Sequence, residues 1–142
     1  MADPTHRQPA RYGGRKDTAL AVVLDCADLD RAAEFWCAAL GYVAFPKEAG
    51  SGPYSVLLPA DGNGIELLLQ QVPESKVSKN RMHLDLRVSD LDAEVSRLIA
   101  LGARYAMDEP LQNNGWVWYV LLDPDGNEFC VLRPPGENRD GL

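Results

Sequence analysis

The feature that most constrains the fold is an internal repeat. The stretches LAVVLDCADLDRAAEFWCAALGYVAF (20–45) and MHLDLRVSDLDAEVSRLIALGARYAM (82–107) share one plan. In each, an alternating strand leads into an Asp-Leu-Asp helix start, an amphipathic helix and a Leu-Gly stop. A supersecondary unit that is repeated along a chain is stabilised by packing against its copy. We therefore expect two similar modules instead of one continuous sheet.

The ends of both helices can be placed from the residues beside them. Asp28 and Asp90 suit the N-cap position, because a short carboxylate accepts hydrogen bonds from the free backbone N–H groups of the first turn. Gly41 and Gly102 suit the position after the helix, where φ is commonly positive. The sequence predicts two helices, over residues 29–40 and 91–101.

Alternating apolar residues and turn signals predict three further strands in each half. The last strand of each half follows a Gly-Asn turn, in the blocks GNGIELLL (62–69) and DGNEFCVL (125–132). Each half is therefore a β-α-β-β-β unit, and the predicted fold class is α+β. The two middle strands are expected around residues 42–46 and 53–59, and around residues 103–107 and 116–122.

The repeat also sets the predicted domain boundaries. We expect a domain over residues 18–133, in which module one spans 18–70, a linker spans 71–80 and module two spans 81–133. The ends, 1–17 and 134–142, are rich in Pro, Gly and charged residues and are expected to be flexible tails.

Composition excludes several classes of function. The 142 residues are 46% hydrophobic and 25% charged, which is typical of a compact globular protein. The net charge of −7 argues against binding to nucleic acids or anionic membranes, which requires clustered Lys and Arg. Without a signal peptide or a long apolar run, we expect a cytoplasmic protein. Its three widely spaced cysteines are expected to be reduced thiols.

The first strand of the second half carries an unusual polar row. His83, Asp85 and Arg87 alternate with aliphatic residues that should pack under the helix, so the polar row faces the other side of the sheet. Aligning the two Gly-Asn turns makes Glu66 equivalent to Cys130, and both join the polar face. Two curled sheets would enclose this face in a cup, with Trp116 and Trp118 as an aromatic wall.

These blocks resemble the vicinal-oxygen-chelate superfamily, which includes glyoxalase I, bleomycin-resistance proteins and extradiol dioxygenases. The resemblance covers residues 18–133, and NRMHLDL and GNEFCVL are most similar to the glyoxalase-like domain branch. It implies paired modules that form a curled mixed-sheet cup. It also implies a small-molecule ligand and a homodimer.

The same resemblance implies metal-ligand positions on the first and last strand of each module. Carried over to this chain, they are Ala21, Glu66, His83 and Cys130. Glu66 and His83 match the family's ligands, whereas Ala21 has no donor atom and Cys130 is a departure. We therefore expect either no cofactor or a weakly bound divalent metal, although a Glu-His-Cys zinc site is chemically allowed.

Three functions from different classes remain open. Glu66 and His83 would shuttle a proton in a non-classical lyase or isomerase, whose activity would differ from that of glyoxalase I. Without a metal, the cup would instead sequester a flat drug or metabolite, as bleomycin-resistance proteins do. In the third function, Cys130 would be a nucleophile activated by His83.

Structural roles fit the same residues equally well. His83 would be a cavity histidine that is hydrogen-bonded to Asp85. Arg87 would form an ion pair with Asp25, and Cys130 would be a small apolar residue that fills space.

Overall fold

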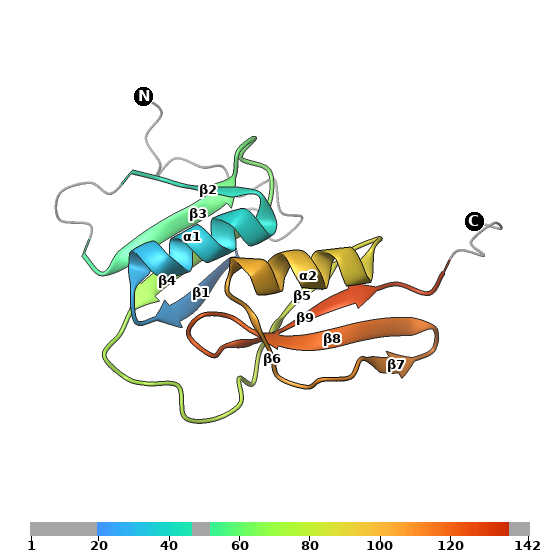
Figure 1. Ribbon diagram of the computed structural model, residues 1–142. Coiled ribbons are helices and arrows are strands. Elements are labelled where there is room, and N and C mark those ends of the chain that lie inside the picture. Colours follow the sequence, from blue (N-terminus) through green and yellow to red (C-terminus); the bar gives the residue numbers. More distant parts are fainter. Residues whose placement is uncertain (1–19, 47–51, 137–142) are drawn as a thin grey trace. The chain divides into compact units, whose positions relative to one another are not determined.

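The computed structural model describes residues 20–46 and 52–136. The chain divides after Pro73 into two compact units, and each unit carries one helix and one mixed sheet (Figure 1). The α+β class and the two β-α-β-β-β modules predicted from the repeat are confirmed. Neither helix in the described part of the chain has the length and apolar character needed to cross a membrane.

The first unit is a four-stranded sheet in the order β1-β4-β3-β2. Its first and last strands, β1 and β4, pair in parallel, and the other neighbours are antiparallel. Helix α1 packs against β2, β3 and β4 (Figure 1). The elements are β1 (Ala21–Cys26), α1 (Leu29–Leu40), β2 (Tyr42–Ala44), β3 (Tyr54–Pro59) and β4 (Glu66–Gln71).

The second unit repeats this plan in a five-stranded sheet. Strands β5, β9, β8 and β6 are neighbours in that order, and β7 also pairs with β8. Again the first and last strands, β5 and β9, are parallel, and α2 packs on β9. The elements are β5 (Leu84–Arg87), α2 (Leu91–Leu101), β6 (Arg104–Tyr105), β7 (Leu111–Asn113), β8 (Trp116–Leu122) and β9 (Glu128–Arg133).

Both helices begin and end as the capping residues predict. Each N-cap carboxylate, on Asp28 and Asp90, accepts the backbone N–H three residues later at 3.1 Å. Gly41 and Gly102 end the helices with φ of 68° and 118°. The helix bounds therefore match the predicted ranges because local chemistry determines them.

The core of each unit lies between its helix and its sheet. Trp36 on α1 is 1% exposed, and Leu69 on β4 and Val131 on β9 are fully buried. The alternation of the first strand and the last strand would also place Leu20 and Ile65 under α1. They are instead 67% and 48% exposed, because they precede β1 and β4.

Strand β7 was not predicted, although the sequence carries its signal. Asn114 and Gly115 both have positive φ, at 48° and 79°, and they connect β7 to β8 as a two-residue loop. This geometry favours Asn-Gly, and it matches the twist of the flanking strands. The NNG sequence therefore forms a hairpin that adds β7 to the second sheet.

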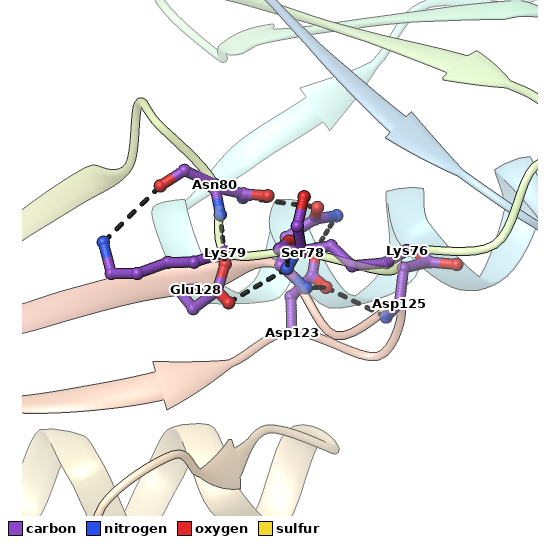
Figure 2. Close-up of polar contacts among 8 residues, drawn as sticks. Lys76, Ser78, Lys79, Asn80, Asp123, Asp125 and Glu128 are labelled. Atoms are coloured by element: carbon purple, nitrogen blue, oxygen red, sulfur yellow. Dashed lines mark hydrogen bonds and ion pairs between the residues drawn. The ribbon is translucent and has the colours of Figure 1, made fainter.

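The segment before β5 is held against the start of β9, although it has no regular secondary structure. Figure 2 shows the polar contacts that this segment makes with Glu128. Lys76 Nζ contacts Glu128 Oε1 at 2.9 Å, and the backbone N–H of Asn80 donates to Glu128 Oε2 at 3.0 Å. We call this arrangement the Glu128 clamp, formed by Lys76, Asn80 and Glu128.

The turn between β8 and β9 contacts the clamp through Asn80. Asp123 is 1% exposed, and its carboxylate accepts the backbone N–H groups of Asn127 at 2.8 Å and Asp125 at 2.9 Å (Figure 2). Asn127 in turn accepts a hydrogen bond from the Asn80 side chain at 3.3 Å. A buried carboxylate is stabilised by N–H donors, and Asp123 thereby positions Asn127 for its contact with Asn80.

The clamp predicts a specific acid sensitivity. Burial raises the pKa of Glu128, but the Asn80 N–H and the Lys76 ammonium outweigh this effect, so the pKa lies below its ordinary value. A lowered carboxyl pKa adds stability above the unfolded-state pKa, and this stability is lost as the pH falls through the folded-state pKa. The wild type should therefore lose stability between about pH 5 and pH 3 more steeply than Lys76→Met in chemical denaturation series.

Lys79→Met is the matched control, because the Lys79 ammonium makes only a 3.5 Å contact to the Asn80 carbonyl. The free energy of unfolding of this variant should fall with pH as steeply as that of the wild type. If the fall were equally shallow in both lysine variants, the cause would be the loss of a positive charge in general and not the loss of the clamp.

Candidate functional site

Strand register changes one equivalence drawn from the sequence. In the first unit Ala21 pairs with Glu66 and Val22 pairs with Leu67, whereas in the second unit Leu84 pairs with Phe129. Because Val22 and Leu84 hold the same place in the repeat, Leu67 corresponds to Phe129. Glu66 therefore corresponds to Glu128, and its predicted equivalence with Cys130 is wrong.

The cause is the length of the connection that leads into the last strand. Three residues lie between Gly62 and the first residue of β4, and one lies between Gly126 and the first residue of β9. The first module thus carries two additional residues, Gly64 and Ile65, after its Gly-Asn turn. An alignment of the two turns shifts every later pairing by these two residues.

A cavity of about 390 Å³ opens on the polar face of the second sheet. It lies on the side opposite to the buried side chains of Phe129 and Val131, because successive residues of a strand face opposite sides. All of the residues that line it belong to the second unit. They are Lys79, His83, Asp85, Asn113, Trp116, Trp118, Val120, Glu128, Cys130 and Leu132.

The part of the cavity formed by β8 is aromatic and apolar. Trp116 and Trp118 are two residues apart on this strand, so both rings face the cavity as the sequence predicts. The guanidinium carbon of Arg87 lies 5.3 Å from the centroid of the Trp116 ring, a distance typical of a cation–π contact. Indole rings in a concave site offer a flat surface on which planar ligands stack.

The part formed by β5 and β9 is polar. His83 Nδ1 lies 3.2 Å from Asp85 Oδ1, and Cys130 Sγ lies 3.9 Å from the same nitrogen. In the neutral imidazole, a proton on Nδ1 that is donated to Asp85 leaves Nε2 as the proton acceptor. His83 is therefore oriented as a hydrogen-bond acceptor or a base.

The surroundings of Cys130 favour its neutral form. Burial raises the pKa of the Cys130 thiol to about 11, and the negative charge and hydrogen bonding of Asp85 add to the effect of burial. Lys79 acts in the opposite direction, but its effect is smaller. The nucleophile is the thiolate and not the thiol, so this environment disfavours the nucleophilic function proposed for Cys130.

The metal site implied by the family does not fit the residues of this chain. Ala21 has no donor atom, and the register places Glu128 where the sequence alignment placed Cys130. Both carboxylate oxygens of Glu128 already accept hydrogen bonds in the clamp. A metal held by the first and last strands of each module would lack one ligand and would compete with Lys76 for another.

Most of the predicted site residues lie at this cavity. His83, Asp85, Cys130, Trp116 and Trp118 line it, and Arg87 lies beside it on Trp116. Glu66 belongs to the first unit, where it is half-buried on β4 opposite Ala21. Its approach to His83 therefore stays a prediction.

Sequence reasoning missed three lining residues. Asn113 comes from the Asn-Gly hairpin, whose turn signal was present in the sequence. Glu128 follows from the strand register, which the turn alignment obscured. Lys79 lies in the segment that was treated as a linker, where no periodicity marks a residue as facing a cavity.

The thiol environment predicts how Cys130 reacts. With a pKa of about 11, roughly one thiol in a thousand is ionised at pH 8, so alkylation by iodoacetamide should be slow. Asp85→Asn removes the negative charge and should lower the pKa and speed the reaction, as mass spectrometry of the Cys130 peptide would show. Asp108→Asn, at an exposed carboxylate, should leave the rate unchanged. A slower reaction in Asp85→Asn would contradict this account of the site.

Comparisons with known proteins agree with this architecture. Residues 21–132 match the family described as the glyoxalase-like domain. No curated protein matches the sequence.

Solved structures of three bacterial proteins share the fold at low sequence identity. A glyoxalase/bleomycin resistance protein/dioxygenase family enzyme from Burkholderia phytofirmans is 21% identical with a TM-score of 0.64, over 80% of this chain and 95% of its own. A glyoxalase family protein from Bacillus cereus is 18% identical with a TM-score of 0.62, over 87% and 99%. A glyoxalase-related enzyme from Fulvimarina pelagi is 17% identical with a TM-score of 0.62, over 84% and 89%. From its family match and its paired β-α-β-β-β modules, the chain belongs to the glyoxalase-like domain family of the vicinal-oxygen-chelate superfamily.

Proposed function

We propose that the second module binds a planar small molecule over the polar face of its sheet. The observation that carries the proposal is the two-sided cavity, in which Trp116 and Trp118 lie toward one side and the His83–Asp85 pair lies toward the other. Pockets with mostly apolar walls and a few convergent polar groups are typical of small-molecule sites. The ring of the ligand would stack on the indoles, and its polar group would hydrogen-bond to His83.

A phenol tests this proposal directly, because it combines both features. 4-Nitrophenol, titrated by absorbance with EDTA present, should bind the wild type. Trp118→Ala removes stacking area and should weaken binding by about tenfold. Tyr105→Ala is the matched aromatic control, since Tyr105 is 44% exposed and does not line the cavity. Equal weakening in both variants would refute binding at this cavity.

A second candidate, a lyase or isomerase, is favoured by the orientation of His83. Asp85 Oδ1 lies 3.2 Å from Nδ1, so it would accept a hydrogen bond from Nδ1 and stabilise the imidazolium that forms when Nε2 takes a proton from a substrate carbon. An apolar wall beside such a base strengthens its effect, because it excludes water from the reacting atoms. Glu66 of the first module is the second proton carrier in this proposal.

A base at this position should catalyse the ring opening of 5-nitrobenzisoxazole. His83 Nε2 takes the proton from the ring carbon, the electron pair of the C–H bond completes a nitrile, and the N–O bond breaks to release a nitrophenolate. His83→Gln should reduce the rate by about 100-fold, in the range of general-base effects, and Asp85→Asn should reduce it less. Absorbance of the nitrophenolate reports the rate, and the Tyr105→Ala variant serves again as the control. Unchanged turnover in His83→Gln would leave simple binding as the function.

Two other expectations stay predictions from the sequence. They are the homodimer that the family resemblance implies and the cytoplasmic location.

A further inference from the structure

Three different metal-binding side chains meet on the polar side of the second sheet. One donor atom each from His83, Asp85 and Cys130 lies within 4.8 Å of the other two. Asp85 and Cys130 are register partners on the parallel strands β5 and β9, and His83 lies two residues before Asp85 on the same face. The strand pairing itself therefore brings the imidazole, the carboxylate and the sulfur together.

The two separations from His83 Nδ1 are close to those of a tetrahedral zinc site. Typical bonds are about 2.0–2.1 Å for Zn–N, about 2.0–2.2 Å for Zn–O and about 2.3 Å for Zn–S. At tetrahedral angles these lengths place N and O about 3.4 Å apart, and N and S about 3.6 Å apart. His83 Nδ1 lies 3.2 Å from Asp85 Oδ1 and 3.9 Å from Cys130 Sγ. Small side-chain rotations would complete this geometry.

Exposure of the three side chains would let an ion enter from the cavity. Cys130 is 7% exposed and would anchor the deep side of the site, whereas the side chains of His83 and Asp85 are 40% and 43% exposed and can adjust. The fourth coordination position would face the cavity of about 390 Å³. Three protein ligands with an open position are characteristic of catalytic zinc sites and not of closed structural ones.

We propose that the second module binds a thiophilic divalent cation, Zn²⁺ in the first instance, through His83, Asp85 and Cys130. This site shares His83 with the one that the family implies, but it uses Asp85 and Cys130 in place of Glu66 and Glu128. Its ligands come from one module alone, and a sulfur ligand selects Zn²⁺ over Mg²⁺ and Mn²⁺. The Glu128 clamp is left intact, since Lys76 and Asn80 keep both of the Glu128 oxygens.

The test is metal binding by the full chain, purified without a His-tag, stripped with a chelator and kept reduced. Titration against a chromophoric zinc chelator should give one Zn²⁺ per chain, and Co²⁺ should produce a sulfur-to-metal charge-transfer band. Cys130→Ala should abolish that band. Asp85→Asn should weaken Zn²⁺ binding by at least about tenfold, since losing even a group that only supports a ligand has effects of this size.

Two matched variants separate this site from its alternatives. Cys37→Ala removes a half-buried thiol on α1, and Glu128→Gln removes the carboxylate at the position that the family implies. Both should retain Zn²⁺ binding and the Co²⁺ band. Thermal melting would confirm that Asp85→Asn, a substitution at a partly exposed side chain, stays folded.

Three outcomes would overturn the proposal. They are the absence of Zn²⁺ binding at micromolar concentration, binding that survives Cys130→Ala, and binding that is lost in Glu128→Gln but kept in Asp85→Asn. The phenol titration is carried out in EDTA, so a failure of metal binding and a failure of small-molecule binding are distinguishable.

Discussion

Parallel pairing between the first and last strands of each module determines where every functional side chain points. In the second module this pairing places Asp85 beside Cys130 and Leu84 beside Phe129, so polar residues share one face and core residues share the other. A slip of one residue would bring Phe129 to the cavity and bury Cys130 under α2. The burial of Phe129 and Val131 therefore stabilises the fold, and it also determines that Cys130 faces the cavity.

Local chemistry made much of this architecture predictable. The N-cap carboxylates, the positive-φ glycines and the alternation of apolar residues each leave a signal in a few consecutive residues, and the helices and the main strands follow from them. The repeat then gave the two modules. The tryptophans and the His83 row were assigned to one face by the same alternation, and all of them except Arg87 line one cavity.

Features that depend on non-local pairing were less accessible from sequence. The equivalence of Glu66 with Glu128 depends on strand register, which two additional residues in one loop obscured. The clamp joins Lys76, in a segment without periodicity, to Glu128 at the start of β9, 52 residues further along the chain. The Asn-Gly hairpin was also not predicted, although its signal is local, because both of its turn residues favour positive φ.

Asp85 determines the chemical character of the polar side. Its carboxylate oxygen lies 3.2 Å from His83 Nδ1, where it can accept a proton-bearing Nδ1 as a hydrogen-bond donor, and its negative charge favours the protonated form of Cys130. A bound cation would reverse the second effect, because a metal stabilises the thiolate that the carboxylate disfavours. The same three side chains thus suit a base and a soft-metal site better than a cysteine nucleophile.

The hairpin that adds β7 contributes to the cavity but not to the helix-facing core. Strand β7 is three residues long, it pairs only with β8 among the described strands, and it contributes one lining residue, Asn113, to the cavity. Substitutions in such a rim leave the helix-facing core intact, whereas changes in β9 disturb both the core and the site. A lineage that carries this domain can therefore change its ligand preference by exchanging the β7 hairpin, and an engineer can randomise residues 111–113 while the scaffold stays folded.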